Sequence, residues 1–248
     1  MRNKEILDFA VTTAQEAGTI VMRYFGTELT RSIKRNKDDF ATEADIAAEK
    51  YILAEIRTNF PSDAIVAEES GRHGATESDY TWLVDPLDGT YQFSESRDNF
   101  GVMLVRAYRD TLELAVVFNP ARGTLATTMK GSGTLLNGKR VELNKMDDLE
   151  DKPLSVEKDN QEKLKGIGYS VTNLGASANT LVTLAGERRA YVSSNGAVWD
   201  WAPAALLLAE AGFKVTDFAR RSFNWQRSQG VIAAPPSLHE EILLILKS

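Results

Sequence analysis

The chain has 248 residues, of which 43% are hydrophobic and 26% are charged, and this composition is typical of a folded globular protein and not of a disordered or fibrous one. It contains no cysteine and only two histidines, which excludes disulfides, iron–sulfur clusters and cysteine zinc sites and disfavours a polyhistidine metal site. The formal net charge of -6 argues against broad binding of nucleic acid through phosphate contacts. Any catalysis is therefore expected to use carboxylates, hydroxyls, backbone amides and, where one binds, a hard metal ion.

The chain shows no sign of membrane insertion. No apolar run approaches the ~18 residues that a spanning helix needs. Residues 1–10 are charged and lack the apolar core of a signal peptide. These features predict a cytoplasmic protein with neither a membrane nor a nucleic acid as its partner.

The first half of the chain predicts two helices followed by a β-rich region. Apolar residues recur every three or four positions from Ile6 to Tyr24, and Gly26 can end this helix. A second helix is expected from about Thr42 to Thr58, because Thr42 and Asp45 form a capping-box pattern. Strands are expected at 64–67, 81–84, 101–108, 111–119, 123–130, 134–136 and 140–143, the last two joined by the turn signal Asn137-Gly138.

The second half predicts alternating strands and helices. Residues 144–161 are polar and charged, so we interpret them as a surface connection between an N-terminal α+β subdomain, 1–145, and a C-terminal α/β subdomain, 146–248. Beyond it, strands are expected at 166–171, 190–193, 213–217 and 230–234, and helices at 176–186, 200–211 and 237–247.

The most informative stretch for function is Trp82-Leu-Val-Asp85-Pro86-Leu87-Asp88-Gly89-Thr90. An apolar strand leads to Asp85, Pro86 keeps that residue extended, and Asp88 follows closely enough for both carboxylates to converge. Gly89 lets the backbone approach a ligand, and the amides that follow suit a phosphate. Two solvated aspartates in a turn are the alternative interpretation, which the buried strand makes less favourable.

Three further acidic positions could join this site. Glu68-Glu69 follows the strand at 64–67, Asp45 lies in the first turn of the second helix, and Asp200 lies between Trp199 and Trp201 at a helix start. Taken alone, each has a simpler interpretation, as surface charge, as a first-turn acid favoured by the helix dipole, or as a helix cap.

Electrostatic repulsion limits how these acids could share one pocket. Two carboxylates about 4 Å apart repel by roughly 4 kcal/mol at an effective dielectric constant near 20, so a cluster needs protons or cations. Oxygen-only ligands favour Mg²⁺ or Mn²⁺ over zinc. Together with the hydroxyl of Thr90 and the amides of Gly89 and Thr90, this predicts metal-assisted hydrolysis of a phosphate ester.

The chain resembles the inositol monophosphatase family of Mg²⁺-dependent, lithium-sensitive phosphatases. The motifs that carry the resemblance span nearly the whole chain and are Asp39-Phe-Ala-Thr-Glu-Ala-Asp45, Ala67-Glu68-Glu69-Ser70, the Trp82–Thr90 stretch extended to Phe93, Leu136-Asn-Gly138, Leu174-Gly175-Ala176-Ser177-Ala178 and Trp199-Asp200. The resemblance implies an α+β fold arranged as a layered αβαβα sandwich, a homodimer and a small phosphorylated substrate.

The resemblance also implies roles for individual residues. The positions implied as metal ligands are Glu68, Asp85, the carbonyl of Leu87, Asp88 and Asp200. Glu68 and Thr90 would activate the attacking water, while Asp45 would help a third metal and support Thr90. The amides of Gly89 and Thr90 would hold the phosphate, and Gly175 and Ala176 would line the substrate side.

The sequence departs from the family pattern at three places. Ala67 replaces a common glycine, and Tyr91-Gln92 replaces a more usual Thr-Asn pair. Ser193 stands where inositol-specific members carry an acid that contacts substrate hydroxyls, so we expect Ser193 on the substrate side and poor discrimination for inositol phosphates.

The function expected is therefore a Mg²⁺-dependent phosphomonoesterase for a small polyol or sugar phosphate. Fructose 1,6-bisphosphate, histidinol phosphate and 3′(2′),5′-bisphosphate nucleotides are alternative substrates, because related enzymes share the same metal motifs. A regulatory protein-binding role in which catalysis is dispensable is an alternative of another class.

Overall fold

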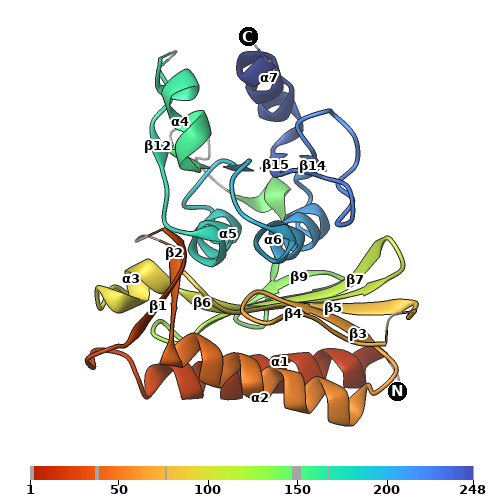
Figure 1. Cartoon of the computed structure of the whole chain (residues 1–248). Helices are drawn as coiled ribbons and strands as arrows, with labels where there is room; N and C mark the ends of the chain where they lie inside the picture. Colours follow the sequence, from red (N-terminus) through yellow and green to blue (C-terminus); the bar gives the residue numbers. More distant parts are fainter. Residues whose placement is uncertain (1–2, 37–38, 76, 147–151, 167, 248) are drawn as a thin grey trace.

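The computed structural model describes residues 3–36, 39–75, 77–146, 152–166 and 168–247, which form five layers. From bottom to top in Figure 1, these are a helix pair, a large sheet, a second helix pair, a smaller sheet and a third helix pair. The layered αβαβα sandwich that the resemblance implied is confirmed. Among the described residues, no helix is both long enough and apolar enough to cross a membrane.

The first helical layer covers one face of the large sheet and consists of α1 (Asn3–Met22) and α2 (Glu43–Asn59). The face that α1 turns to the sheet is made of Ala10, Ala14, Ala17 and Val21, spaced three or four apart and fully buried. Small side chains at this spacing let the helix lie close to the strands. Both predicted helices are confirmed.

The start of α2 is fixed by the predicted capping box. The backbone amide of Ala44 donates to the hydroxyl of Thr42, and the amide of Thr42 donates to the carboxylate of Asp45 at 2.7 Å. This arrangement satisfies backbone groups that a helix leaves unpaired at its first turn. It also holds the Asp45 carboxylate in place, fully buried.

The large sheet has the strand order β10-β9-β8-β7-β6-β5-β3-β4 and is antiparallel except for the pair β3 and β5. Its strands are β3 (Ala64–Ala67), β4 (Gly71–Gly74), β5 (Tyr80–Asp88), β6 (Gly101–Tyr108), β7 (Thr111–Asn119), β8 (Thr124–Met129), β9 (Gly133–Leu136) and β10 (Lys139–Val141). Asn137 and Gly138 both have positive φ, which confirms the predicted hairpin turn. A short helix α3 (Thr90–Ser94) follows β5, and a 3₁₀ turn η1 (Leu143–Lys145) follows β10.

The smaller sheet has the order β12-β11-β13-β15-β14, with β12, β11 and β13 parallel to one another. Its strands are β11 (Leu154–Val156), β12 (Val171–Thr172), β13 (Tyr191–Ser193), β14 (Lys214–Thr216) and β15 (Val231–Ala234). The helices α5 (Ala176–Leu184) and α6 (Val198–Glu210) lie between the two sheets. The helices α4 (Lys158–Lys165) and α7 (Pro236–Lys247) cover the outer face.

Two elements differ from the sequence-based prediction. Residues 144–161 are not simply a surface connection, because β11 lies in them with Leu154 and Val156 fully buried, and α4 begins there. The strand expected at 166–171 is reduced to β12 at Val171–Thr172, and Gly168 has a φ of 98°, which extended strands do not adopt. The part of the connection at 147–151 and residue 167 lie outside the described residues.

Several elements were not predicted at all, among them β4 and the strand pair β1 (Arg31–Asn36) and β2 (Asp39–Thr42). The hairpin of β1 and β2 stands beside the sheet and leads into α2. The subdomain boundary at residue 145 stays a prediction. The described strands change sheets between 141 and 154, whereas α5 and α6 from the second half pack against strands of the first.

Candidate active site

Three carboxylates from two distant parts of the chain converge between the sheets. Asp85 and Asp88 lie at the end of β5, and Asp200 lies in the first turn of α6. One carboxylate oxygen from each lies within 4.8 Å of the others. The pairing of β5 with β6 shifts register between Asp85 and Asp88. In a regular strand, residues three apart face opposite sides, so this irregularity at Pro86 allows both side chains to reach one site.

The position of Asp88 is fixed by the N-terminus of α5. Its carboxylate accepts hydrogen bonds from the amides of Ala176 at 3.2 Å and Ser177 at 2.7 Å, and from the Ser177 hydroxyl at 2.5 Å. Gly175, with a φ of 96°, lies so close that an added Cβ would be 3.3 Å from the Asp88 carboxylate. A glycine here lets α5 approach the aspartate.

The other two carboxylates have fewer hydrogen bonds. The Asp200 carboxylate accepts the amide of Ala197 at 2.5 Å, and Oδ1 of Asp85 accepts the amide of Leu87 at 3.0 Å. Among the described residues, Oδ2 of Asp85 is buried and has no hydrogen-bond partner. A buried carboxylate oxygen without a partner is costly, and a cation removes that cost.

The residues present therefore fit a hard divalent metal ion. Burial and the charges of Glu68 and Asp88 raise the pKa of Asp85 well above its usual range. Burial and the charge of Asp88 do the same for Asp200. Asp85, Asp88 and Asp200 would hold the ion, since all offer the oxygen ligands that Mg²⁺ and Mn²⁺ prefer.

Glu68 and Glu69 follow β3 and lie at the side of this cluster. Lys34 from β1 donates to Oε1 of Glu68 at 2.9 Å and to Oε1 of Glu69 at 2.6 Å. Although burial lowers the pKa of Lys34, these two carboxylates raise it above its usual value. Glu49, buried on α2, accepts hydrogen bonds from the amide of Glu69 and the hydroxyl of Ser70 and so fixes the turn that carries Glu68.

Thr90 lies directly after the aspartates, at the first position of α3. Its hydroxyl is 2.9 Å from Oδ1 of Asp45 and 3.1 Å from the carbonyl oxygen of Leu87, so it can donate to either. Gly89 has a φ of 83°, and an added Cβ would lie 2.7 Å from the carbonyl oxygen of Asn99. Only glycine permits this turn, which presents Thr90 and the first amides of α3 beside the carboxylates.

The expected substrate-side residues differ in their surroundings. Gly175 and Ala176 lie beside Asp88, as described above. Ser193 is fully buried, and its hydroxyl lies 2.6 Å from Oε2 of Glu157 and 2.9 Å from Nε1 of Trp201. The serine hydroxyl thus hydrogen-bonds a carboxylate, Glu157, and its expected place on the substrate side stays a prediction.

Sequence reasoning missed four residues at or near this site. Ser177 donates a hydrogen bond to Asp88, and Lys34 donates one to Glu68. Glu49 fixes the turn that carries Glu68, and Glu157 accepts the hydroxyl of Ser193. Ser177 lies inside a family motif and could have been assigned from it. The other three carry no local signal, because their partners are distant in sequence.

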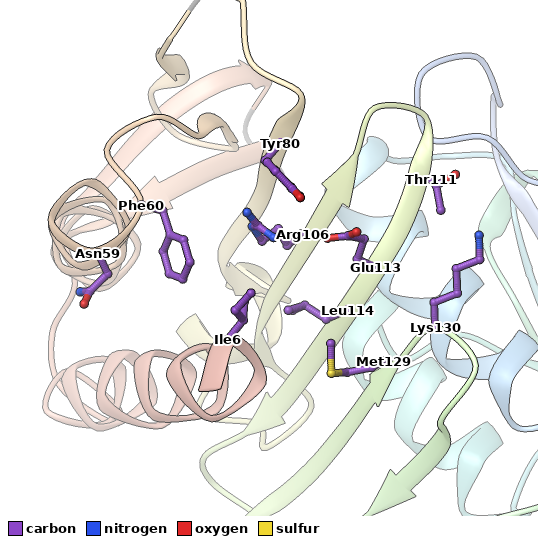
Figure 2. A pocket seen from close by; sticks show the side chains of 10 residues that line it. All are labelled: Ile6, Asn59, Phe60, Tyr80, Arg106, Thr111, Glu113, Leu114, Met129 and Lys130. Atoms are coloured by element: carbon purple, nitrogen blue, oxygen red, sulfur yellow. Dashed lines mark hydrogen bonds and ion pairs between the residues drawn. The ribbon is translucent and has the colours of Figure 1, made fainter. Parts of the chain in front are cut away.

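A cavity of about 610 Å³ lies away from the acidic cluster, and Figure 2 shows its lining. Its buried cation, Arg106, donates to Asp63 at 2.8 Å and to Glu113 at 3.2 Å and stacks 3.7 Å from the ring centroid of Tyr80. This arginine is thus neutralised by the protein itself and stabilises the junction of the helix layer with the sheet. The cavity contributes no group to the acidic site.

We expect the stability of the metal-free protein to fall as pH rises from 5 to 7.5. Burial raises the pKa of Asp45 to about 6, and burial raises the pKa of Glu69 and of Glu157 to about 7. The ordinary pKa of these carboxyl groups in the unfolded chain is near 4. At pH values between the unfolded and the folded pKa, the folded chain therefore binds more protons than the unfolded chain, and the free energy of unfolding decreases as pH rises. Thermal denaturation in EDTA is expected to show a fall in Tm of at least about 5 °C. Saturating Mg²⁺ should reduce that fall, and a Tm that rises over this range in EDTA would contradict the prediction.

The layered fold with an oxygen-lined acidic site at its centre defines the class of protein. The chain matches the model of the inositol monophosphatase family over residues 2–248 and belongs to that family. It is 31% identical to the Nus factor SuhB of Salmonella typhimurium over 257 residues, which covers 96% of this chain and 94% of the relative. It is 34% identical to the Nus factor SuhB of Pseudomonas aeruginosa over 231 residues, covering 86% and 85%.

Solved structures agree with this assignment. The extragenic suppressor protein SuhB from Bartonella henselae superimposes with a TM-score of 0.90 at 26% identity, covering 98% of this chain and 99% of that one. An IMPase of Thermotoga maritima superimposes with a TM-score of 0.88 at 27% identity, covering 98% and 97%. The predicted family is confirmed.

Proposed function

We propose that the chain is a Mg²⁺-dependent phosphomonoesterase for a small polyol or sugar phosphate, with Mn²⁺ as a second usable ion. The observation that carries this proposal is the convergence of Asp85, Asp88 and Asp200 around the unpartnered oxygen of Asp85. A bound divalent ion there would supply positive charge to the phosphate and to the leaving oxygen and would lower the pKa of a bound water.

The chain's own residues would position the water and the phosphate. Because the Thr90 hydroxyl can donate its proton to Asp45, the Thr90 oxygen is free to accept a hydrogen bond from a water molecule. Glu68, an acid beside the cluster, would accept a proton from that water. The amides of Gly89 and Thr90 would bind phosphate oxygens, as amides at a helix start do.

Membership of the inositol monophosphatase family and the similarity to an IMPase of known structure support catalysis. They leave the substrate to experiment. Fructose 1,6-bisphosphate, histidinol phosphate and 3′(2′),5′-bisphosphate nucleotides belong in the same panel as inositol 1-phosphate and glycerol 2-phosphate.

Chelation tests the proposed activity. We expect the purified protein to release inorganic phosphate from members of this panel in millimolar Mg²⁺, to lose that activity in EDTA, and to regain it when Mg²⁺ is added in excess. The reason is that the carboxylates need a cation both to stay together and to act on phosphate. Equal turnover in EDTA and in Mg²⁺ would contradict the proposal.

A regulatory role is a second candidate function. Its support is the name Nus factor, which the SuhB relatives of Salmonella typhimurium and Pseudomonas aeruginosa carry. In that role the chain would bind another protein, and hydrolysis would be dispensable. A variant that lacks phosphatase activity but restores normal growth to a strain in which the gene is deleted would favour this candidate.

Three finer expectations stay predictions. These are a homodimer, a cytoplasmic location and inhibition by lithium. Size-exclusion chromatography with light scattering, cell fractionation and phosphate release in tens-of-millimolar lithium would test them one by one.

A further inference from the structure

A buried carboxylate outside the metal cluster lies at the same end of the smaller sheet. Glu157 directly follows β11, and Ser193 ends the parallel neighbour β13, so the carboxyl ends of two parallel strands place them side by side. The amide of Glu157 donates to the carbonyl of Val192 at 3.0 Å and fixes this alignment. In sheets of this kind, ligands bind at the carboxyl ends of the strands.

Glu157 is only 9% exposed, yet its described partners are neutral. Oε2 accepts the Ser193 hydroxyl at 2.6 Å, and Oε1 accepts the Tyr191 hydroxyl at 3.2 Å. Both donors are themselves fully buried. The backbone amide of Asn195 is a third, neutral hydrogen-bond partner. An ionised carboxylate can accept about four hydrogen bonds, so these three donors leave it able to accept one more.

Glu157 is linked to the proposed metal ligand Asp200 through two hydrogen bonds. The Ser193 hydroxyl, which donates to Glu157, accepts the indole Nε1 of Trp201 at 2.9 Å, and Trp201 directly follows Asp200 in α6. The charge of Asp88 is among the causes that raise the pKa of Glu157, after burial. The charge of Glu157 is in turn among the causes that raise the pKa of Asp200, after burial, Asp88 and Glu68. A substrate whose phosphate is held at the carboxylate cluster would therefore place its alcohol portion within reach of Glu157.

We propose that Glu157 recognises the hydroxyl groups of the substrate's alcohol portion and makes the enzyme selective for phosphate esters of polyhydroxy alcohols. This inference rests on the proposed phosphatase function. A carboxylate repels the phosphate dianion, so its favourable contact is with the neutral part of the ester. A carboxylate that accepts a hydroxyl proton forms a charge-assisted hydrogen bond, which neutral Ser193 cannot offer.

Glycerol 2-phosphate and isopropyl phosphate form a matched pair for the test, because they share a carbon skeleton and differ only in the two free hydroxyls. The wild-type protein is expected to prefer glycerol 2-phosphate in kcat/KM by about tenfold, the value of one charge-assisted hydrogen bond. Glu157→Gln, which keeps the shape and an acceptor for Ser193, should reduce this ratio to near one. Glu162→Gln, an exposed glutamate on α4, is the control and should keep the wild-type ratio.

The outcomes separate the two proposals. Hydrolysis of neither ester, nor of any other phosphate in the panel, by the wild type would overturn the phosphatase function. Hydrolysis of both esters at equal kcat/KM by the wild type would overturn the role of Glu157 alone, and this result needs no variant to fold. If Glu157→Gln lowers kcat/KM for both esters by the same factor, Glu157 acts on the site's structure and the proposal is wrong.

Discussion

Asp85→Asn is expected to slow Mg²⁺-dependent phosphate release by about 1000-fold, which corresponds to about 4 kcal/mol of barrier. The substitution keeps the shape of the side chain and an oxygen for the amide of Leu87. It replaces the unpartnered, buried Oδ2 by an amide nitrogen, which cannot bind a cation. Phosphate release from the best substrate, measured over a range of Mg²⁺ concentrations, gives the size of the loss.

The same variant should not weaken the metal-free fold. An amide nitrogen at this position removes one negative charge from the cluster and can donate to a neighbouring carboxylate, so the free energy of unfolding in EDTA should stay level or rise by about 1 kcal/mol. Urea denaturation of both proteins in EDTA measures this. Marked destabilisation of Asp85→Asn would show that Asp85 serves the fold and not a metal site.

Thr90→Ala is expected to lower kcat by about 100-fold with little change in KM. The hydroxyl of Thr90, held by Asp45 at 2.9 Å, is proposed to orient the attacking water, and that contact matters mainly in the transition state. Steady-state kinetics of Thr90→Ala and of Thr90→Ser, which keeps the hydroxyl, make the comparison. We expect Thr90→Ser to retain most of the activity, and an equally large loss in both variants would contradict a role for the hydroxyl.

The elements that the sequence predicted well are those whose signals are local. The Thr42–Asp45 capping box starts α2 as expected, and the Asn137-Gly138 turn joins β9 and β10. The convergence of Asp85 and Asp88 could also be expected, because one strand end delivers both. That Asp200 joins them depended on the family resemblance, since 112 positions separate it from Asp88 and no local pattern links the two.

The elements that the sequence missed depend on contacts between distant segments. β11 lies in a charged stretch, and only its position between β12 and β13 makes Leu154 and Val156 core residues. Because that stretch was interpreted as a surface connection, Glu157 was not considered as a site residue. Ser193 was placed on the substrate side by the family resemblance, and that role stays a prediction; the sequence did not indicate that its hydroxyl hydrogen-bonds Glu157 and Trp201.

Mg²⁺ binding by the wild type and by Asp85→Asn tests the central claim most directly. Calorimetric titration gives the dissociation constant for Mg²⁺, and phosphate release against Mg²⁺ concentration gives the concentration for half-maximal activity. We expect these two values to agree for the wild type and the dissociation constant of Asp85→Asn to be at least about tenfold weaker. Equal Mg²⁺ affinity in the two proteins, with phosphate release intact in Asp85→Asn, would contradict the assignment of the metal site to Asp85, Asp88 and Asp200.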